Sequence, residues 1–73
     1  MATVEAGFDY FVDDPLHHDL SAPCLDDLAE ALAHRLGFEV EMVFPEEGRE
    51  RIVLYDPEDE EAEYAYTVGR RAR

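Results

Sequence analysis

The sequence contains no lysine and no tryptophan, and it has one cysteine, Cys24. A single cysteine excludes an internal disulfide bond and favours a reducing compartment. No apolar run approaches the roughly 18 residues of a membrane-spanning helix. The first residues, MATVEAGF, also lack the basic segment that begins a signal peptide. We therefore expect a soluble, cytoplasmic protein that does not associate with membranes.

Length and apolar content indicate one small folded domain. At 73 residues the chain forms one domain, 1–73, in a size range where the hydrophobic core alone gives marginal stability. Hydrophobic residues make up 47% of the chain, which is the composition of a folded protein rather than of a disordered tail.

The charge balance is the unusual property of this sequence. Nineteen acidic residues outnumber six basic ones, all arginine, and the formal net charge is −13. Three arginines lie in the last four residues, so residues 1–69 carry 19 acids and 3 bases, a net charge of −16. Over a compact diameter of about 29 Å, that is one charge per roughly 1.8 Å, comparable with about 1.7 Å for double-stranded DNA. Such self-repulsion lowers stability, so we expect either a selected partner or a saline habitat to account for it.

Residues 21–37, SAPCLDDLAEALAHRLG, predict one amphipathic helix. Ser21 is the expected N-cap and Gly37 the stop signal. Cys24 is expected to be a small buried residue. The apolar stripe that should face the core consists of Leu25, Leu28, Ala29, Leu32 and Leu36. The opposite, solvated face carries Asp26, Asp27, Glu30 and His34.

Four strands are predicted around this helix, at residues 8–12, 38–44, 51–55 and 62–68. Residues 16–20 form a loop that leads into the helix, and turns are expected at residues 45–49 and 56–61. The alternation in the second strand points four side chains toward the core. These are Phe38, Val40, Met42 and Phe44. In the fourth strand Tyr64, Tyr66 and Val68 share one side.

The register of the second and third strands follows from the same alternation. Pairing Met42 with Arg51 would bury a charge against a thioether, whereas a shift of one residue pairs Met42 with Ile52 and Val40 with Leu54. We prefer the second register. It pairs Val43 with Arg51 and Glu39 with Tyr55 on the outer face. That face then carries Glu39, Glu41 and Glu63, with Arg51 as the one base among them.

These elements predict an α+β fold in the order β-α-β-β-β, with the helix packed on one face of a four-stranded, mostly antiparallel sheet. If the first strand pairs with the second, the helical crossover makes that pair parallel and right-handed. An uncovered edge strand would leave a homodimer possible.

No arrangement of residues predicts catalysis or metal binding. His17 and His18 lie among Asp13, Asp14 and Asp19, but adjacent histidines of a regular element cannot both reach one ion, so a solvated loop is favoured. Cys24 and His34 would be about 15 Å apart along the helix, too far for a thiolate pair. Asp26 and Glu30 are better explained as a solvated face than as catalytic carboxylates. We therefore expect no enzyme activity, no cofactor and no metal.

The acids recur on the helix, on the outer face of the sheet and in the turns. A rigid negative surface of this kind would be steered toward a cleft lined with arginine and lysine, such as one that holds phosphate backbones. The candidate partner-binding residues form two groups, which we expect on different faces. They are Asp26, Asp27, Glu30, Glu39 and Glu41, and then Glu58, Asp59, Glu60, Glu61 and Glu63.

In size, fold economy and charge, the chain resembles the small acidic inhibitors that phages and mobile elements use against nucleic-acid-binding host defences, including anti-CRISPR and anti-restriction proteins. This resemblance implies a DNA mimic that blocks the nucleic-acid channel of a basic partner in the host cytoplasm, without chemistry and without binding nucleic acid itself. The C-terminal arginines Arg70, Arg71 and Arg73 depart from a pure mimic. Two alternatives remain open. One is a small interaction module such as an antitoxin, an immunity protein or an assembly subunit, and the other is a domain made acidic by a saline habitat.

Overall fold

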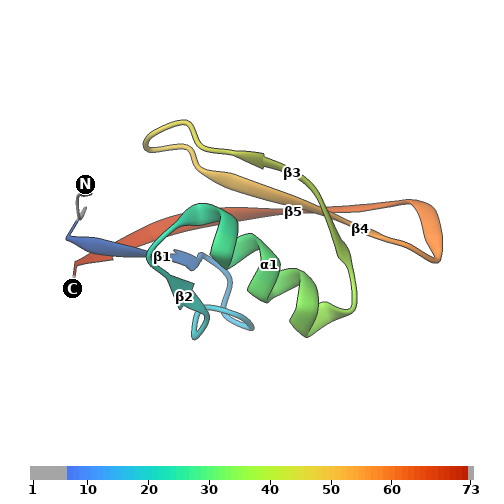
Figure 1. Cartoon of the computed structure of the whole chain (residues 1–73), viewed down its shortest axis with the longest axis horizontal. Helices are drawn as coiled ribbons and strands as arrows, with labels where there is room; N and C mark the ends of the chain where they lie inside the picture. The colour runs from blue at the N-terminus through green and yellow to red at the C-terminus, as the bar shows by residue number, and fades with distance from the viewer. Residues whose placement is uncertain (1–6, 73) are drawn as a thin grey trace.

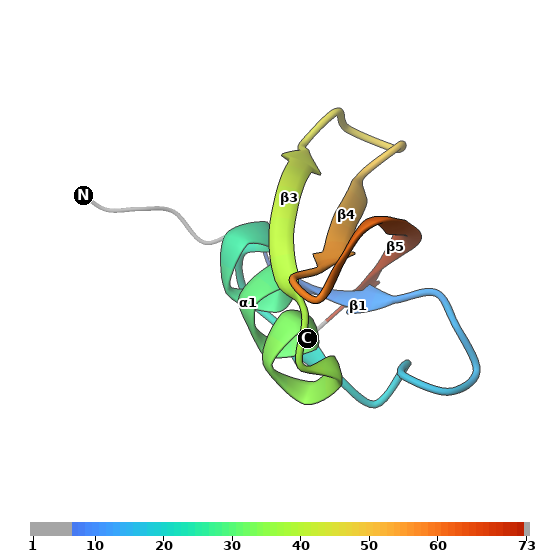
Figure 2. The same ribbon diagram turned by 90° about the vertical axis from the view of Figure 1, so that its right-hand side faces the viewer.

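The computed structural model describes residues 7–72, without the side chain of Glu60. Its elements are β1 (Phe8–Val12), β2 (Ser21–Ala22), α1 (Leu25–Leu36), β3 (Glu39–Phe44), β4 (Arg51–Asp56) and β5 (Asp59–Ala72). The strands form one sheet in the order β2-β1-β5-β4-β3, and every neighbouring pair is antiparallel. Helix α1 lies across one face of this sheet, which curls around it (Figures 1 and 2). The predicted α+β class is confirmed, but the sheet has five strands and not four.

The last strand, β5, which was predicted as residues 62–68, accounts for the main difference from the predicted topology. Strand β5 runs to Ala72, four residues beyond the predicted end at Val68. Its first part pairs with β4 through Thr67, and Val68 to Ala72 pair with β1. The parallel pairing considered for residues 8–12 and 38–44 does not form, because β5 and β4 lie between β1 and β3.

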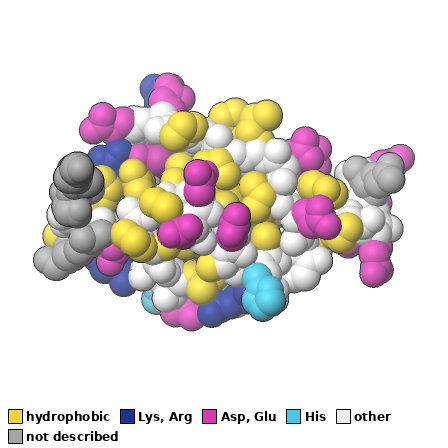
Figure 3. All heavy atoms as spheres, in the orientation of Figure 1, with side chains coloured by type: hydrophobic (Ala, Val, Ile, Leu, Met, Phe, Trp, Pro, Cys, Tyr) yellow, Lys and Arg dark blue, Asp and Glu magenta, His cyan; other side chains and the backbone are white. Residues whose placement is uncertain are grey.

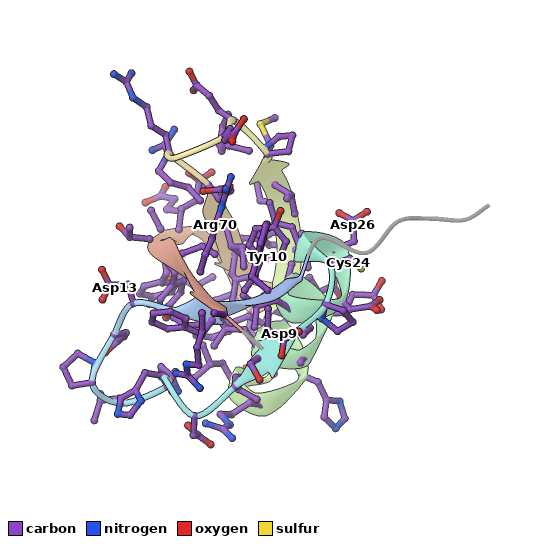
Figure 4. The ribbon with its side chains drawn as sticks, turned by 90° about the vertical axis from the view of Figure 1, so that its left-hand side faces the viewer. Asp9, Tyr10, Asp13, Cys24, Asp26 and Arg70 are labelled. Carbon is purple, nitrogen blue, oxygen red and sulfur yellow. The ribbon has the colours of Figure 1, made fainter. Side chains whose placement is uncertain are left out.

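The helix begins later than predicted. Ser21 and Ala22 pair with Phe11 and Tyr10 as the short strand β2, so Ser21 is not the N-cap. Cys24 occupies that position, with extended backbone and no side-chain cap hydrogen bond. It lies at the start of α1 and its side chain is exposed, so the prediction that it is buried was wrong (Figure 4). The predicted end is confirmed: Gly37 adopts a left-handed conformation with φ of 74°.

The register of β3 and β4 is as predicted at one end and different at the other. Glu39 pairs with Tyr55 and Val40 with Leu54, but the register then shifts between Val40 and Met42. This β-bulge leaves one extra residue in β3 and reverses the faces of the residues that follow.

Beyond the bulge, Val43 pairs with the buried Ile52, and Met42 pairs with Val53. The predicted inward position of Met42 was therefore wrong, and its side chain is 49% exposed. Phe44 also turns away from the core and pairs with Arg51, whose guanidinium carbon lies 4.5 Å from the centre of the Phe44 ring. Because of the bulge, the β-branched Val43 and not the flexible thioether of Met42 occupies the position that faces the core.

The core lies between α1 and the concave face of the sheet. Leu28 and Leu32 of the helix are fully buried with Ile52 and Leu54 of β4 and Val12 of β1. Leu25, Ala29 and Ala33 complete the buried helix stripe, while Leu36 is partly buried. The predicted apolar face of the helix is therefore confirmed. No helix among residues 7–72 has the length and apolarity needed to span a membrane.

Candidate partner-binding surface

The β4–β5 hairpin forms one end of the molecule and is surrounded by carboxylates. Pro57 and Glu58 make a two-residue turn between the strands. The carboxylate of Asp56 accepts a hydrogen bond from the Glu58 backbone N–H at 2.9 Å, and that of Asp59 accepts one from the Glu61 N–H at 3.3 Å. These side-chain contacts fix the backbone of the turn. In Figure 1 the hairpin projects at the right-hand end of the long axis, which measures 39 Å.

Two further carboxylates lie in the neighbouring row of the sheet. Glu39 of β3 pairs with Tyr55 of β4, and Tyr55 pairs with Glu63 of β5. Directly paired residues point to the same face, so Tyr55 lies between two carboxylates. Its hydroxyl donates a hydrogen bond to Glu39 Oε1 at 2.8 Å. We call the hairpin and this row the acidic end. It consists of Glu39, Asp56, Glu58, Asp59, Glu61 and Glu63.

The other predicted residues lie elsewhere. Asp26, Asp27 and Glu30 are exposed on α1, where the first two also stabilise the positive end of the helix dipole. We call these three the helix acids. Carboxylates stand among hydrophobic side chains on the helix side of the molecule in Figure 3. Glu41 is exposed at the bulge of β3, and the Glu60 side chain lies outside the described part. The expected division into two faces does not hold for Glu39 and Glu63, which share one row.

The arginines that could neutralise the acidic end are held elsewhere. Arg35 donates two hydrogen bonds to Asp19, each 2.9 Å long. Arg70 binds Glu50 and lies over Phe8, with its guanidinium carbon 4.8 Å from the centre of the ring. Arg71 lies in the same way over Phe11, at 4.7 Å. Within residues 7–72, no carboxylate of the acidic end lies within ion-pair distance of an arginine.

The arginines named above therefore lie away from the acidic end. Arg70 and Arg71 lie on the part of β5 that pairs with β1, at the end opposite the hairpin. Figure 3 shows acidic side chains without basic ones at the hairpin end, and both kinds toward the other end. A charge distribution of this kind orients a protein as it approaches a basic partner.

Two other features were considered as sites. An open depression of about 460 Å³ is lined by Glu46, Gly48, Arg49, Glu50, Arg51 and Thr67. His17 packs its ring edge-on against Tyr66, and its buried Nδ1 has no hydrogen-bond partner in the described structure. No group of three or more potential metal ligands comes together within residues 7–72.

Comparison of the chain with protein-family models, with curated proteins and with solved structures gives no match. The chemistry of the acidic end must therefore be judged from its own groups. Carboxylates without counterions can accept hydrogen bonds and ion pairs from a basic surface, and arginine offers the matching geometry.

Sequence patterns predicted part of this surface. The register correctly placed Glu39 opposite Tyr55, so their proximity could be derived before the structure was known. The outward position of Met42 and Phe44 could not be derived from the sequence. A single bulge residue reverses the alternation there, and no glycine or proline marks its place.

Proposed function

We propose that this chain is a non-enzymatic inhibitor whose acidic end occupies the positively charged, nucleic-acid-binding cleft of a partner protein. The observation that carries this proposal is the acidic end itself. Six carboxylates lie together around a projecting hairpin, and within residues 7–72 none of them is paired with an arginine.

Crowded carboxylates repel one another in the free protein, and a basic cleft removes that repulsion. The hydrogen bonds from backbone N–H groups to Asp56 and Asp59 hold the hairpin in one conformation before a partner is bound. A preorganised surface loses less entropy on binding than a flexible acidic tail does. The hairpin therefore suits a cleft that otherwise binds a regular row of phosphates.

The matched test compares two variants with equal net charge. Glu58→Gln, Glu61→Gln and Glu63→Gln together remove three charges from the acidic end. Asp26→Asn, Asp27→Asn and Glu30→Gln remove three helix acids, so both variants change the net charge from −13 to −10. Affinity for a panel of purified DNA- and RNA-binding proteins, including CRISPR effectors and restriction enzymes, is measured at 50 and 300 mM salt. Displacement of a labelled DNA duplex is measured in parallel.

We expect the acidic-end variant to lose about tenfold or more in affinity and the helix variant to lose less than about threefold. Binding should weaken with salt, and the wild-type chain should displace the DNA. Equal losses in the two variants would show that only net charge matters. That result, binding without displacement of DNA, or binding to no member of the panel contradicts the proposal.

A further inference from the structure

The face of the sheet that turns away from α1 has a regular arrangement of charge. Across β3, β4 and β5, its first row consists of Glu39, Tyr55 and Glu63. The second row of residues that point to this face consists of Met42, Val53 and Ala65. The third row consists of Phe44, Arg51 and Thr67. Along the strands the face therefore changes from acidic to apolar to basic.

The apolar row is open to solvent. Met42 is 49% exposed, Ala65 is exposed and Val53 is half-buried. Helix α1 covers only the opposite face of the sheet. In Figure 2 the helix lies on one side of β4 and β5, and the other side of these strands has no helix over it. Contact with another protein surface would remove these apolar side chains from water.

Arg51 at the basic end has no carboxylate partner within residues 7–72, although the chain is strongly acidic. Its guanidinium lies over the Phe44 ring. Arg49 and Thr67 lie beside it and line the same open depression, together with Glu46 and Glu50. The guanidinium of Arg51 thus offers hydrogen-bond donors that no carboxylate of the described residues binds.

We propose that this face binds a second copy of the chain, with a twofold axis that crosses the strands at Val53. Arg51 and Tyr55 lie two residues before and two residues after Val53. A twofold axis across the strands therefore places the Arg51 row of one copy over the Glu39–Tyr55–Glu63 row of the other. Both acidic rows then face basic rows, and the two apolar rows meet at the axis. An axis along the strands would instead place like charges together.

The face is small, so the dimer is weak. Three strands over five residues measure about 14 by 17 Å, well below the roughly 800 Å² per partner of a standard interface. The net charge of −13 on each copy also opposes association. Salt screens this long-range repulsion more than it screens the pairs in contact. Association should therefore strengthen between 20 and 300 mM salt, whereas binding to a basic cleft should weaken.

The test is sedimentation equilibrium of the 8.4 kDa chain at 0.05 to 1 mM in 300 mM salt. Arg51→Glu places acid against acid, and Glu63→Arg places arginine against arginine. Each should weaken dimerisation at least tenfold. The double variant exchanges the charges and keeps the net charge of −13. It should restore the dimer to within about threefold of the wild type.

Glu30→Arg is the matched control for Glu63→Arg, because it makes the same change in net charge on the exposed side of α1. It should leave dimerisation unchanged or strengthen it. Circular dichroism establishes that each variant is folded. The proposal is overturned by a wild-type chain that is monomeric at 1 mM, by Glu63→Arg dimerising as well as Glu30→Arg, or by a double variant that stays dissociated. None of these outcomes depends on a nucleic-acid-binding partner, so failure here leaves the proposed function to its own test.

Discussion

The guanidinium of Arg70 donates two hydrogen bonds to one carboxylate oxygen of Glu50, a residue that is 2% exposed. Arg70 lies near the end of β5, and Glu50 precedes β4. The same guanidinium covers the ring of Phe8 in β1, with 4.8 Å between the guanidinium carbon and the ring centre. A single arginine therefore joins the first strand, the last strand and the β3–β4 loop.

Removing the charge of Glu50 should destabilise the fold. Burial opposes ionisation of Glu50, but the hydrogen bonds from Arg70 and from backbone N–H groups outweigh it, and the pKa lies below its usual value. Glu50→Gln weakens the pair at a buried position, so we expect thermal unfolding to shift down by roughly 5 to 10 °C. Glu47→Gln is the control, because the Glu47 side chain is 86% exposed and lies 3.6 Å from Arg70. It should leave the melting temperature within about 2 °C of the wild type. Equal shifts for the two variants would contradict a structural role for Glu50.

The same arginine explains why the last strand was predicted too short. Gly69, Arg70 and Arg71 interrupt the alternation that ends at Val68. In the structure, both arginines make cation–π contacts with aromatic side chains of β1. Arg71 lies over Phe11 and Arg70 lies over Phe8. Such pairing joins residues some 60 positions apart. No local pattern in residues 62–72 indicates it, although the aromatic cluster in residues 8–11 was visible.

Gly69 is required because the Phe11 ring lies directly on it. A Cβ atom at Gly69 would be 2.6 Å from Phe11 Cζ and 2.9 Å from Cε1. We expect Gly69→Ala to lower the free energy of unfolding by about 1 to 2 kcal/mol, since the ring must move and its contact with Arg71 changes. In a Phe11→Ala background the clash is absent, so the same substitution should be neutral or stabilising. Urea unfolding of the four proteins measures this difference. A loss of equal size in both backgrounds would contradict the steric explanation.

The Asp19–Arg35 pair should make a pH-dependent contribution to stability. The hydrogen bonds from Arg35 lower the pKa of Asp19 from 3.8 to about 2. A depressed pKa in the folded state means that the contribution is present above about pH 4 and is lost as the pH falls toward 2. We expect the wild type to melt above Asp19→Asn at pH 6 by a small margin, because both groups are exposed, and the margin to vanish near pH 2. In an Arg35→Gln background the margin at pH 6 should be clearly smaller, because Arg35 is the largest cause of the lowered pKa. A margin of unchanged size there would show that Arg35 is not its main cause.

The candidate surface could be predicted from the sequence only in its composition. The sequence predicted the acidic turn in residues 56–61 and the register of Glu39 with Tyr55, because charge runs and alternation are local properties. The concentration of acids at one end of the molecule was not predicted from the sequence. It depends on the β4–β5 hairpin projecting at one end of the long axis, while Arg70 and Arg71 pair with β1 at the other end.

The acidic end should make the free protein less stable, which distinguishes a binding surface from adaptation to salt. Replacing Glu58, Glu61 and Glu63 by glutamine relieves repulsion that no arginine of residues 7–72 offsets. At 10 mM salt we expect this variant to melt roughly 2 to 5 °C above the wild type, and the difference to shrink near 1 M, where the screening length is about 3 Å. Thermal unfolding monitored by circular dichroism measures both. Adaptation to a saline habitat predicts instead that the wild type loses its fold at 10 mM salt. The binding hypothesis predicts that the wild type remains folded at 10 mM salt and that removal of these carboxylates raises its stability. The carboxylates then lower the stability of the free protein, and binding to a basic partner would offset that loss.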